Sequence, residues 1–151
     1  MIYNIPKQYE PIKQGDIFLG IPKVEIEFAQ GLPTIVDDST KIPWDDIVNK
    51  GEITPAVLPV FPVPAIVISQ DCDARREADI TLCEIKEFCK IETDYDKISS
   101  LPRKVKFLTR QCRINLKWFY LPPDAKLGFD KAMAVDFLST INVPSRLLKK
   151  A

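Results

Sequence analysis

The sequence contains no histidine among its 151 residues. Without an imidazole, the chain alone cannot build a Ser–His or Cys–His nucleophile, a histidine general base or a histidine-ligated metal site. No apolar run approaches the roughly 18–20 residues that cross a bilayer, and residues 1–10 show no signal-peptide pattern. We therefore expect no membrane partner. These absences exclude several classes of enzyme without indicating a function.

The composition is that of a soluble globular protein, with 46% apolar and 28% charged residues. A chain of this length typically buries roughly 70% of its unfolded surface, so one domain covering residues 1–151 needs no metal or disulfide to fold. The four cysteines lack the closely spaced pairs of zinc sites and indicate reduced thiols in a cytoplasmic protein. They are Cys72, Cys83, Cys89 and Cys112. We expect neither a metal nor a cofactor.

Charge is unevenly distributed, although the net charge is zero. Residues 1–75 hold six basic and eleven acidic residues, whereas residues 76–151 hold fifteen and ten. Between Lys97 and Pro123 there are seven basic residues and no acidic one. This asymmetry is typical of a protein with an anionic partner, and equally of two complementary faces of a self-associating surface. A solvated basic hairpin would show the same pattern.

Proline is concentrated in the first half, where nine of the thirteen prolines lie at or before Pro64. Four of them interrupt the segment TPAVLPVFPVPA at residues 54–65. A central strand does not tolerate so many missing N–H donors, so we interpret this segment as a loop or an edge. The domain is therefore predicted to carry a proline-rich insertion loop at about residues 29–63.

Short strands dominate the secondary structure that the apolar pattern predicts. We expect them at residues 17–19, 23–28, 65–69, 79–85, 103–108, 113–121 and 132–143. In the segment 23–28, Val24, Ile26 and Phe28 are predicted to face inward, and the run 65–69 fits a strand buried on both faces. Short helices are predicted at residues 43–48 and 144–150. This pattern favours a mostly β fold, either a barrel or a sandwich.

The order of three motifs resembles that of the MazF/PemK-like toxins. QGDIFL at residues 14–19 is similar to the family's "GDI" strand, and PAIVIS at residues 64–69 is similar to its "PAVVLS" strand. A further strand follows at residues 80–85, and VDF at residues 135–137 looks like the family's end. SQDCD at residues 69–73 is similar to an S-x-x-C-D signature of uncharacterised bacterial relatives. The resemblance implies a small SH3-like barrel with short helices, including one at the C-terminus.

The residues that the family uses to cleave RNA are missing at the matching positions. Its active members have an arginine near the start of the "PAVVLS" strand and a threonine after the next strand. Here no arginine precedes Ala65, and Lys86 and Glu87 follow Ile85. The resemblance thus implies a barrel that has lost the recognised ribonuclease residues and acts as a binding module. The context that it implies is a toxin–antitoxin or phage-defence system.

A polar cluster directly after the 65–69 strand supplies the weak catalytic candidates. They are Asp71, Cys72, Asp73, Arg75 and Arg76. An active nuclease using the two arginines and the two aspartates is the alternative function. Cys72 as a nucleophile is opposed by its flanking carboxylates, which raise a thiol pKa. The aspartates could bind a divalent cation, or they could simply hydrogen-bond the backbone of an ordinary turn.

The segment 103–120 is the candidate for binding RNA or DNA, as a hairpin with one cationic face. The residues expected on that face are Lys104, Lys106, Arg113, Lys117 and Phe119. Cations combined with an aromatic ring suit single-stranded nucleic acid, although a charged edge strand also prevents aggregation. The third alternative is a structural subunit of a homo-oligomer or of a complex with another protein.

Overall fold

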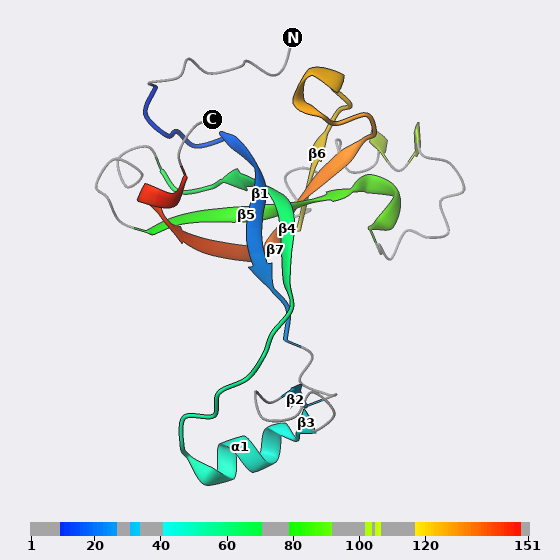
Figure 1. Ribbon diagram of the computed structural model, residues 1–151. Helices are drawn as coiled ribbons and strands as arrows, with labels where there is room; N and C mark the ends of the chain where they lie inside the picture. The colour runs from blue at the N-terminus through cyan, green and yellow to red at the C-terminus, as the bar shows by residue number, and fades with distance from the viewer. Residues whose placement is uncertain are drawn as a thin grey trace. The chain divides into compact units, whose positions relative to one another are not determined.

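The computed structural model describes residues 10–26, 31–33, 41–70, 79–91, 102–103, 105–106 and 117–148. The chain divides into two units, of which the first comprises Met1–Gly20 and Val63–Ala151. The second unit comprises Ile21–Pro62. It contains most of the predicted 29–63 loop together with the segment before it. We call these unit 1 and unit 2 and describe each by itself (Figure 1).

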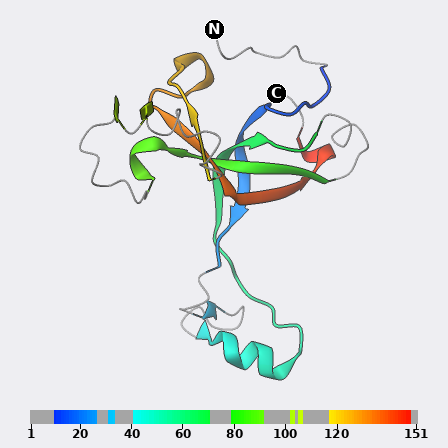
Figure 2. The ribbon, with the colours of Figure 1, turned by 180° about the vertical axis from the view of Figure 1, so that it is seen from behind.

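A five-stranded sheet with the strand order β1-β4-β5-β7-β6 forms the main structure (Figures 1 and 2). Its strands are β1 (Ile17–Val24), β4 (Val60–Val67), β5 (Asp79–Glu87), β6 (Trp118–Leu121) and β7 (Met133–Pro144). The pairs β4–β5, β5–β7 and β6–β7 are antiparallel. The mostly β prediction is therefore confirmed, as are the strands predicted at 65–69 and 79–85. Among the described residues the sheet is not closed between β1 and β6.

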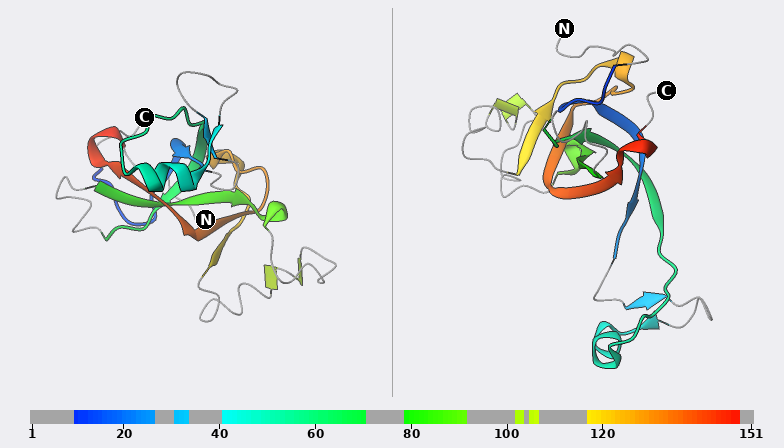
Figure 3. Two further views of the ribbon diagram at one scale, coloured as in Figure 1. Left: turned by 90° about the horizontal axis from the view of Figure 1, so that it is seen from below. Right: turned by 90° about the vertical axis from the view of Figure 1, so that its left-hand side faces the viewer.

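The long strand β7 is bent by a bulge against β5. Cys83 pairs with Thr140, whereas the next residue, Glu84, pairs with Asp136. The three residues between these positions of β7, 137–139, have no partner in β5. Extra residues on one strand bend it and increase its twist, and β7 is strongly curved in Figure 3.

The prolines of β4 are accommodated by the alternation of its backbone groups. Val67 exchanges hydrogen bonds with Asp16 and Gly15 on the β1 side, and the Ile68 N–H donates to the Thr81 carbonyl on the β5 side. By alternation, the nitrogen of Pro64 lies on the β5 side. Pairing with β5 begins only at the next residue, so the missing donor breaks no ladder bond. Of the two alternatives predicted for residues 60–64, the loop is wrong, because these residues belong to β4, whereas the edge fits, because they do not pair with β5.

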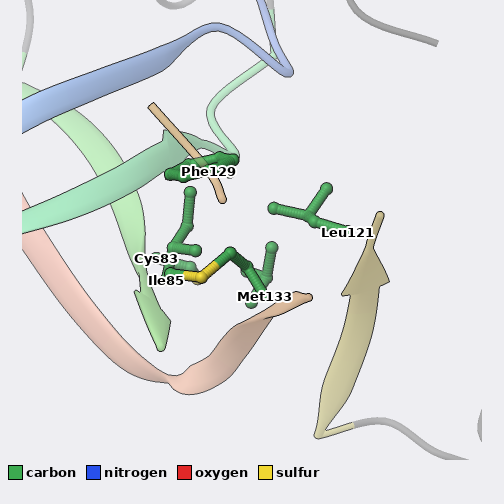
Figure 4. Packing of buried hydrophobic residues seen from close by; sticks show 6 residues of the cluster. Cys83, Ile85, Leu121, Phe129 and Met133 are labelled. Carbon is green, nitrogen blue, oxygen red and sulfur yellow. The ribbon is translucent and has the colours of Figure 1, made fainter. Parts of the chain in front are cut away.

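Two apolar clusters cover opposite faces of the β5–β7–β6 region. The first contains Cys83, Ile85, Leu121, Phe129, Met133 and Val135 (Figure 4). The second contains Phe88, Ile91, Trp118 and Ala134, with Val105 and Tyr120 packed against it. The ring centroids of Phe88 and Tyr120 are 5.5 Å apart in an edge-to-face arrangement. Cys83 has no exposed surface and belongs to the core.

The predicted 103–120 hairpin is wrong. Residues 102–103 and 105–106 are helical, and the partner of β6 is β7. Lys-Val-Lys alternation fits a strand, but Pro102 favours the first turn of a helix, and Val105 packs onto the Trp118 cluster. A tertiary contact thus overrides the local pattern.

Two further predictions differ from the structure at strand and helix ends. Among the described residues of the alternating segment 23–28, the strand ends at Val24, and Val24 and Ile26 are exposed, so their inward orientation is wrong. Phe28 lies outside the described residues. At the C-terminus, the helix that begins after Pro144 is a single 3-10 turn, η4 (Ser145–Leu147). Residues 149–151 lie outside the described part. Two more 3-10 turns are η2 (Phe88–Lys90) and η3 (Ala125–Leu127).

Unit 2 contains the two-stranded sheet of β2 (Leu32–Pro33) and β3 (Lys41–Ile42), followed by helix α1 (Trp44–Lys50). The predicted helix is confirmed, and its N-cap is Pro43. The helix ends at Gly51, whose φ of 61° is left-handed. Gly31 is required in this unit, because an added Cβ would lie 2.7 Å from the Ile42 carbonyl oxygen. No residue of α1 is buried.

Candidate nucleic-acid interface

The weak catalytic candidates Asp71, Cys72, Asp73, Arg75 and Arg76 all lie outside the described residues, as do Lys104 and Arg113. The remaining binding candidates Lys106, Lys117 and Phe119 are described and exposed. Lys106 belongs to the helical residues 105–106, whereas the other two lie at the start of β6. The described binding candidates therefore come from a helical turn and from the start of β6, and not from one hairpin.

Strand β6 combines buried and exposed side chains, and Leu121, which shares a face with Phe119, is buried in the first apolar cluster. Trp118 is buried and Tyr120 is half-buried, whereas Phe119 keeps 50% of its surface exposed. The Lys117 ammonium lies 5.0 Å from the centre of the Trp118 ring, in a cation–π contact. This contact holds a positive charge at the start of the strand.

A second exposed aromatic residue lies beside Phe119 on the neighbouring strand. Phe119 pairs with Val135, and the Phe137 N–H donates to the Lys117 carbonyl at 2.9 Å. Residue 137 is therefore opposite residue 117, which puts Phe119 and Phe137 on the same face as diagonal neighbours. Phe137 is 38% exposed. We call Phe119 and Phe137 the aromatic patch; the sequence indicated its first member only.

The opposite face of the β5–β7 pair carries a polar cluster that the sequence analysis missed. Glu84 and Asp136 are paired across the strands and are both buried. The Lys86 ammonium lies 3.3 Å from a Glu84 oxygen and 3.2 Å from an Asp136 oxygen. The Ser139 hydroxyl donates to Glu84 at 2.9 Å, and the Leu138 N–H donates to Asp136 at 3.1 Å. Lys86 thus binds both carboxylates, while the bulge of β7 supplies two further donors.

This cluster is not a metal site or a nucleophile in the described part of the chain. Within that part, no group of three or more acidic, cysteine or histidine side chains could hold a metal ion. Burial, and secondly the charge of Asp136, raises the pKa of the Cys83 thiol above its usual value of 9.0. Cys83 therefore stays protonated at neutral pH, which disfavours nucleophilic chemistry. Lys86, with its side chain 35% exposed, keeps the carboxylates paired.

Comparison of the chain with protein-family models, with curated proteins and with solved structures gave no match. Within the described ranges, every helix is too short or too polar to cross a membrane.

Proposed function

We propose that the protein binds single-stranded nucleic acid through the aromatic patch and Lys117. The observation that carries this proposal is the pair of exposed phenylalanines on one face of adjacent strands. Bases stack on exposed aromatic rings, and each stacked base typically contributes about 1–3 kcal/mol. Lys117 supplies positive charge beside the patch. The basic run from Lys97 to Lys117, which leads into β6, contains no acidic residue to repel phosphates.

The same proposal includes the MazF/PemK-like barrel and the loss of the family's ribonuclease chemistry. A mostly antiparallel five-stranded sheet is compatible with such a barrel. The sequence motifs at residues 14–19 and 64–69 support it, since they belong to the adjacent strands β1 and β4. A binding role within a toxin–antitoxin or phage-defence system is the context that this resemblance suggests.

Binding is tested with fluorescently labelled oligo(U) and oligo(dT) by anisotropy at low salt. Phe119→Ala and Phe137→Ala should each weaken binding about tenfold, because each removes one stacking surface. Phe61→Ala, an equally exposed phenylalanine in unit 2, is the matched control and should bind normally. If wild type binds neither oligonucleotide, or if both patch variants bind normally, the proposal fails.

The charge contribution is tested by reversing the basic residues to glutamate. The variant carries Glu in place of Lys104, Lys106, Arg113 and Lys117. Binding should be abolished, and wild-type affinity should fall steeply as salt rises, because phosphate contacts release counterions. Incubation of the same oligonucleotides with Mg²⁺ or with EDTA should leave them intact. Cleavage that EDTA abolishes would support the nuclease alternative instead.

A further inference from the structure

Beyond the end of β6, one side of strand β7 has no strand partner among the described residues. β6 pairs with residues 133–136 of β7, and the Phe137 N–H still donates to the Lys117 carbonyl on that side. β5 continues along the opposite side as far as Pro144, as can be followed in Figures 1 and 2. We call residues 138–144 the β7 edge. An open edge presents backbone donors and acceptors that can pair with a further strand.

The alternation of the backbone shows which residues face the open side. The Thr81 carbonyl accepts hydrogen bonds from the residues directly after β4, so the backbone groups of Thr81 face β4. Its two neighbours in β5 therefore face β7, where they pair with Ile141 and Val143. Thr140 and Asn142 direct their N–H and C=O groups away from β5, to the open side. Both residues are exposed.

Both ends of the β7 edge lack a donor for another strand. The Leu138 N–H already donates to a carboxylate oxygen of the polar cluster at 3.1 Å, and Pro144 has no N–H. Thr140 and Asn142 are therefore the residues between these ends whose N–H groups face the open side. They lie on either side of Ile141, one residue away in each direction. An edge with this symmetry is complementary to a second copy of itself.

The composition of the β7 edge also permits pairing with itself. Its residues, LSTINVP, include no charged side chain, so two copies meet without like-charge repulsion. Sheet edges are commonly protected by lysine or by proline within the strand. β1, at the end of the same sheet, contains Pro22 and Lys23, whereas the β7 edge has its single proline at the last position. Leu138 is 72% exposed and is an apolar side chain that pairing would cover.

From these observations we propose that the chain dimerises by antiparallel pairing of two β7 edges. The two-fold axis passes at Ile141, so that Thr140 of each copy lies opposite Asn142 of the other. Four backbone hydrogen bonds form, because each of these residues contributes one donor and one acceptor. Ile141 faces its own counterpart in a pair of β-branched residues, which stabilises paired strands. Leu138 lies opposite Pro144. The interface uses neither the aromatic patch nor Lys117, so it does not depend on the proposed binding of nucleic acid.

The mass of the full chain is measured by analytical ultracentrifugation from about 1 to 100 μM, since a dimer responds to concentration. Wild type should dimerise, with little change as salt rises, because the interface is uncharged. Thr140→Pro removes one donor from each copy but no bond to β5, and should raise the dissociation constant at least about tenfold. Thr140→Lys should act in the same direction, because a lysine protects an edge. Leu147→Lys, which adds the same charge at an exposed residue of η4, is the control and should dimerise normally.

Hydrogen exchange by NMR locates the interface within β7. The amides of Thr140 and Asn142 should become protected as the concentration of wild type rises, and should exchange rapidly in the Thr140→Lys variant. Those of Ile141 and Val143 should be protected under both conditions, because they pair with β5. A wild type that is monomeric at every concentration would overturn the proposal and leave the edge to a strand of another protein. Dimerisation of both Thr140 variants like wild type would overturn it too, as would a dimer in which the two outward amides exchange at the monomer rate.

Discussion

The two units of this chain use apolar residues in opposite ways. Unit 1 buries them in two clusters on the faces of the β5–β7–β6 region, and outside these clusters Ile80 and Leu82 also have no exposed surface. In unit 2, helix α1 also contains apolar residues, but none of its residues is buried. The burial in unit 1 accompanies strand pairing, because β5 has antiparallel partners on both sides. Apolar content alone therefore does not indicate where a core forms.

Hydrogen exchange should show the largest difference between the units. Amides that hydrogen-bond between β5 and β7 should exchange only through global unfolding, which for a domain of ordinary stability corresponds to about 5–15 kcal/mol. Amides of α1 should exchange through local opening, at rates close to those of an unstructured peptide in a monomeric sample. Measurement by NMR at low protein concentration tests this, and equal protection in α1 and β5 would contradict it.

Truncation of one apolar residue in each unit should separate their stabilities. Leu82→Ala removes a completely buried side chain and should lower the free energy of unfolding by about 2–5 kcal/mol. Val48→Ala removes an exposed one and should change it by less than about 0.5 kcal/mol. Urea denaturation followed by circular dichroism measures both values. A Val48 variant as unstable as the Leu82 variant would show that unit 2 has a core after all.

Each unit contains a lysine that forms an ion pair, and replacing these two lysines should give a smaller difference in stability. Lys86→Met leaves the buried Glu84 and Asp136 without their shared cation and should cost about 1–2 kcal/mol. The cost is below that of a fully buried pair, because Lys86 is partly exposed and solvent screens its charge. Lys23→Met, which removes the ion pair with the exposed Glu25, should change stability by less than about 1 kcal/mol. Thermal unfolding of both variants tests the ranking, and equal losses would contradict it.

The smallest effect concerns the half-buried Glu87 at the end of β5. Hydrogen bonds from Lys90 and then from Lys131 hold the pKa of its carboxyl below the usual 4.5. A lowered pKa in the folded state stabilises the protein above pH 4.5, and this contribution disappears as the pH falls through the folded-state pKa. Lys131→Ala should move the Glu87 pKa back toward 4.5 in an NMR titration. Lys126→Ala, at an exposed lysine of η3, should leave it unchanged.

The sequence predicts those elements whose pattern depends on local chemistry. The run 65–69 and the segment 79–85 are confirmed as strands because β-branched residues favour a buried sheet. The segment 103–108 has an equally good strand alternation, but its described residues are helical. There, contact between Val105 and the Trp118 cluster decides the structure, and no local pattern contains that information.

The candidate site was also predictable only in part, because some of its neighbours are set by strand register. Phe119 follows from alternation along one strand, whereas Phe137 becomes its neighbour only through the β6–β7 register. The charged residues of the polar cluster look solvent-exposed in the sequence. Their burial depends on Asp136, which comes from a strand more than fifty residues further along the chain. A charged residue in a predicted core strand, such as Glu84 or Lys86, is the signal that could have indicated this cluster.

Most of unit 2 lies between β1 and β4 in the sequence, and this position determines where the chain should tolerate insertions and deletions. These two strands are neighbours in the sheet, although residues 25–59 separate them in the sequence. Doubling the length of a flexible connection costs only about 0.6 kcal/mol of closure entropy. The gap between Val24 and Val60 is therefore a place where segments could be exchanged, shortened or replaced by another module while the β5–β7 core keeps its pairing.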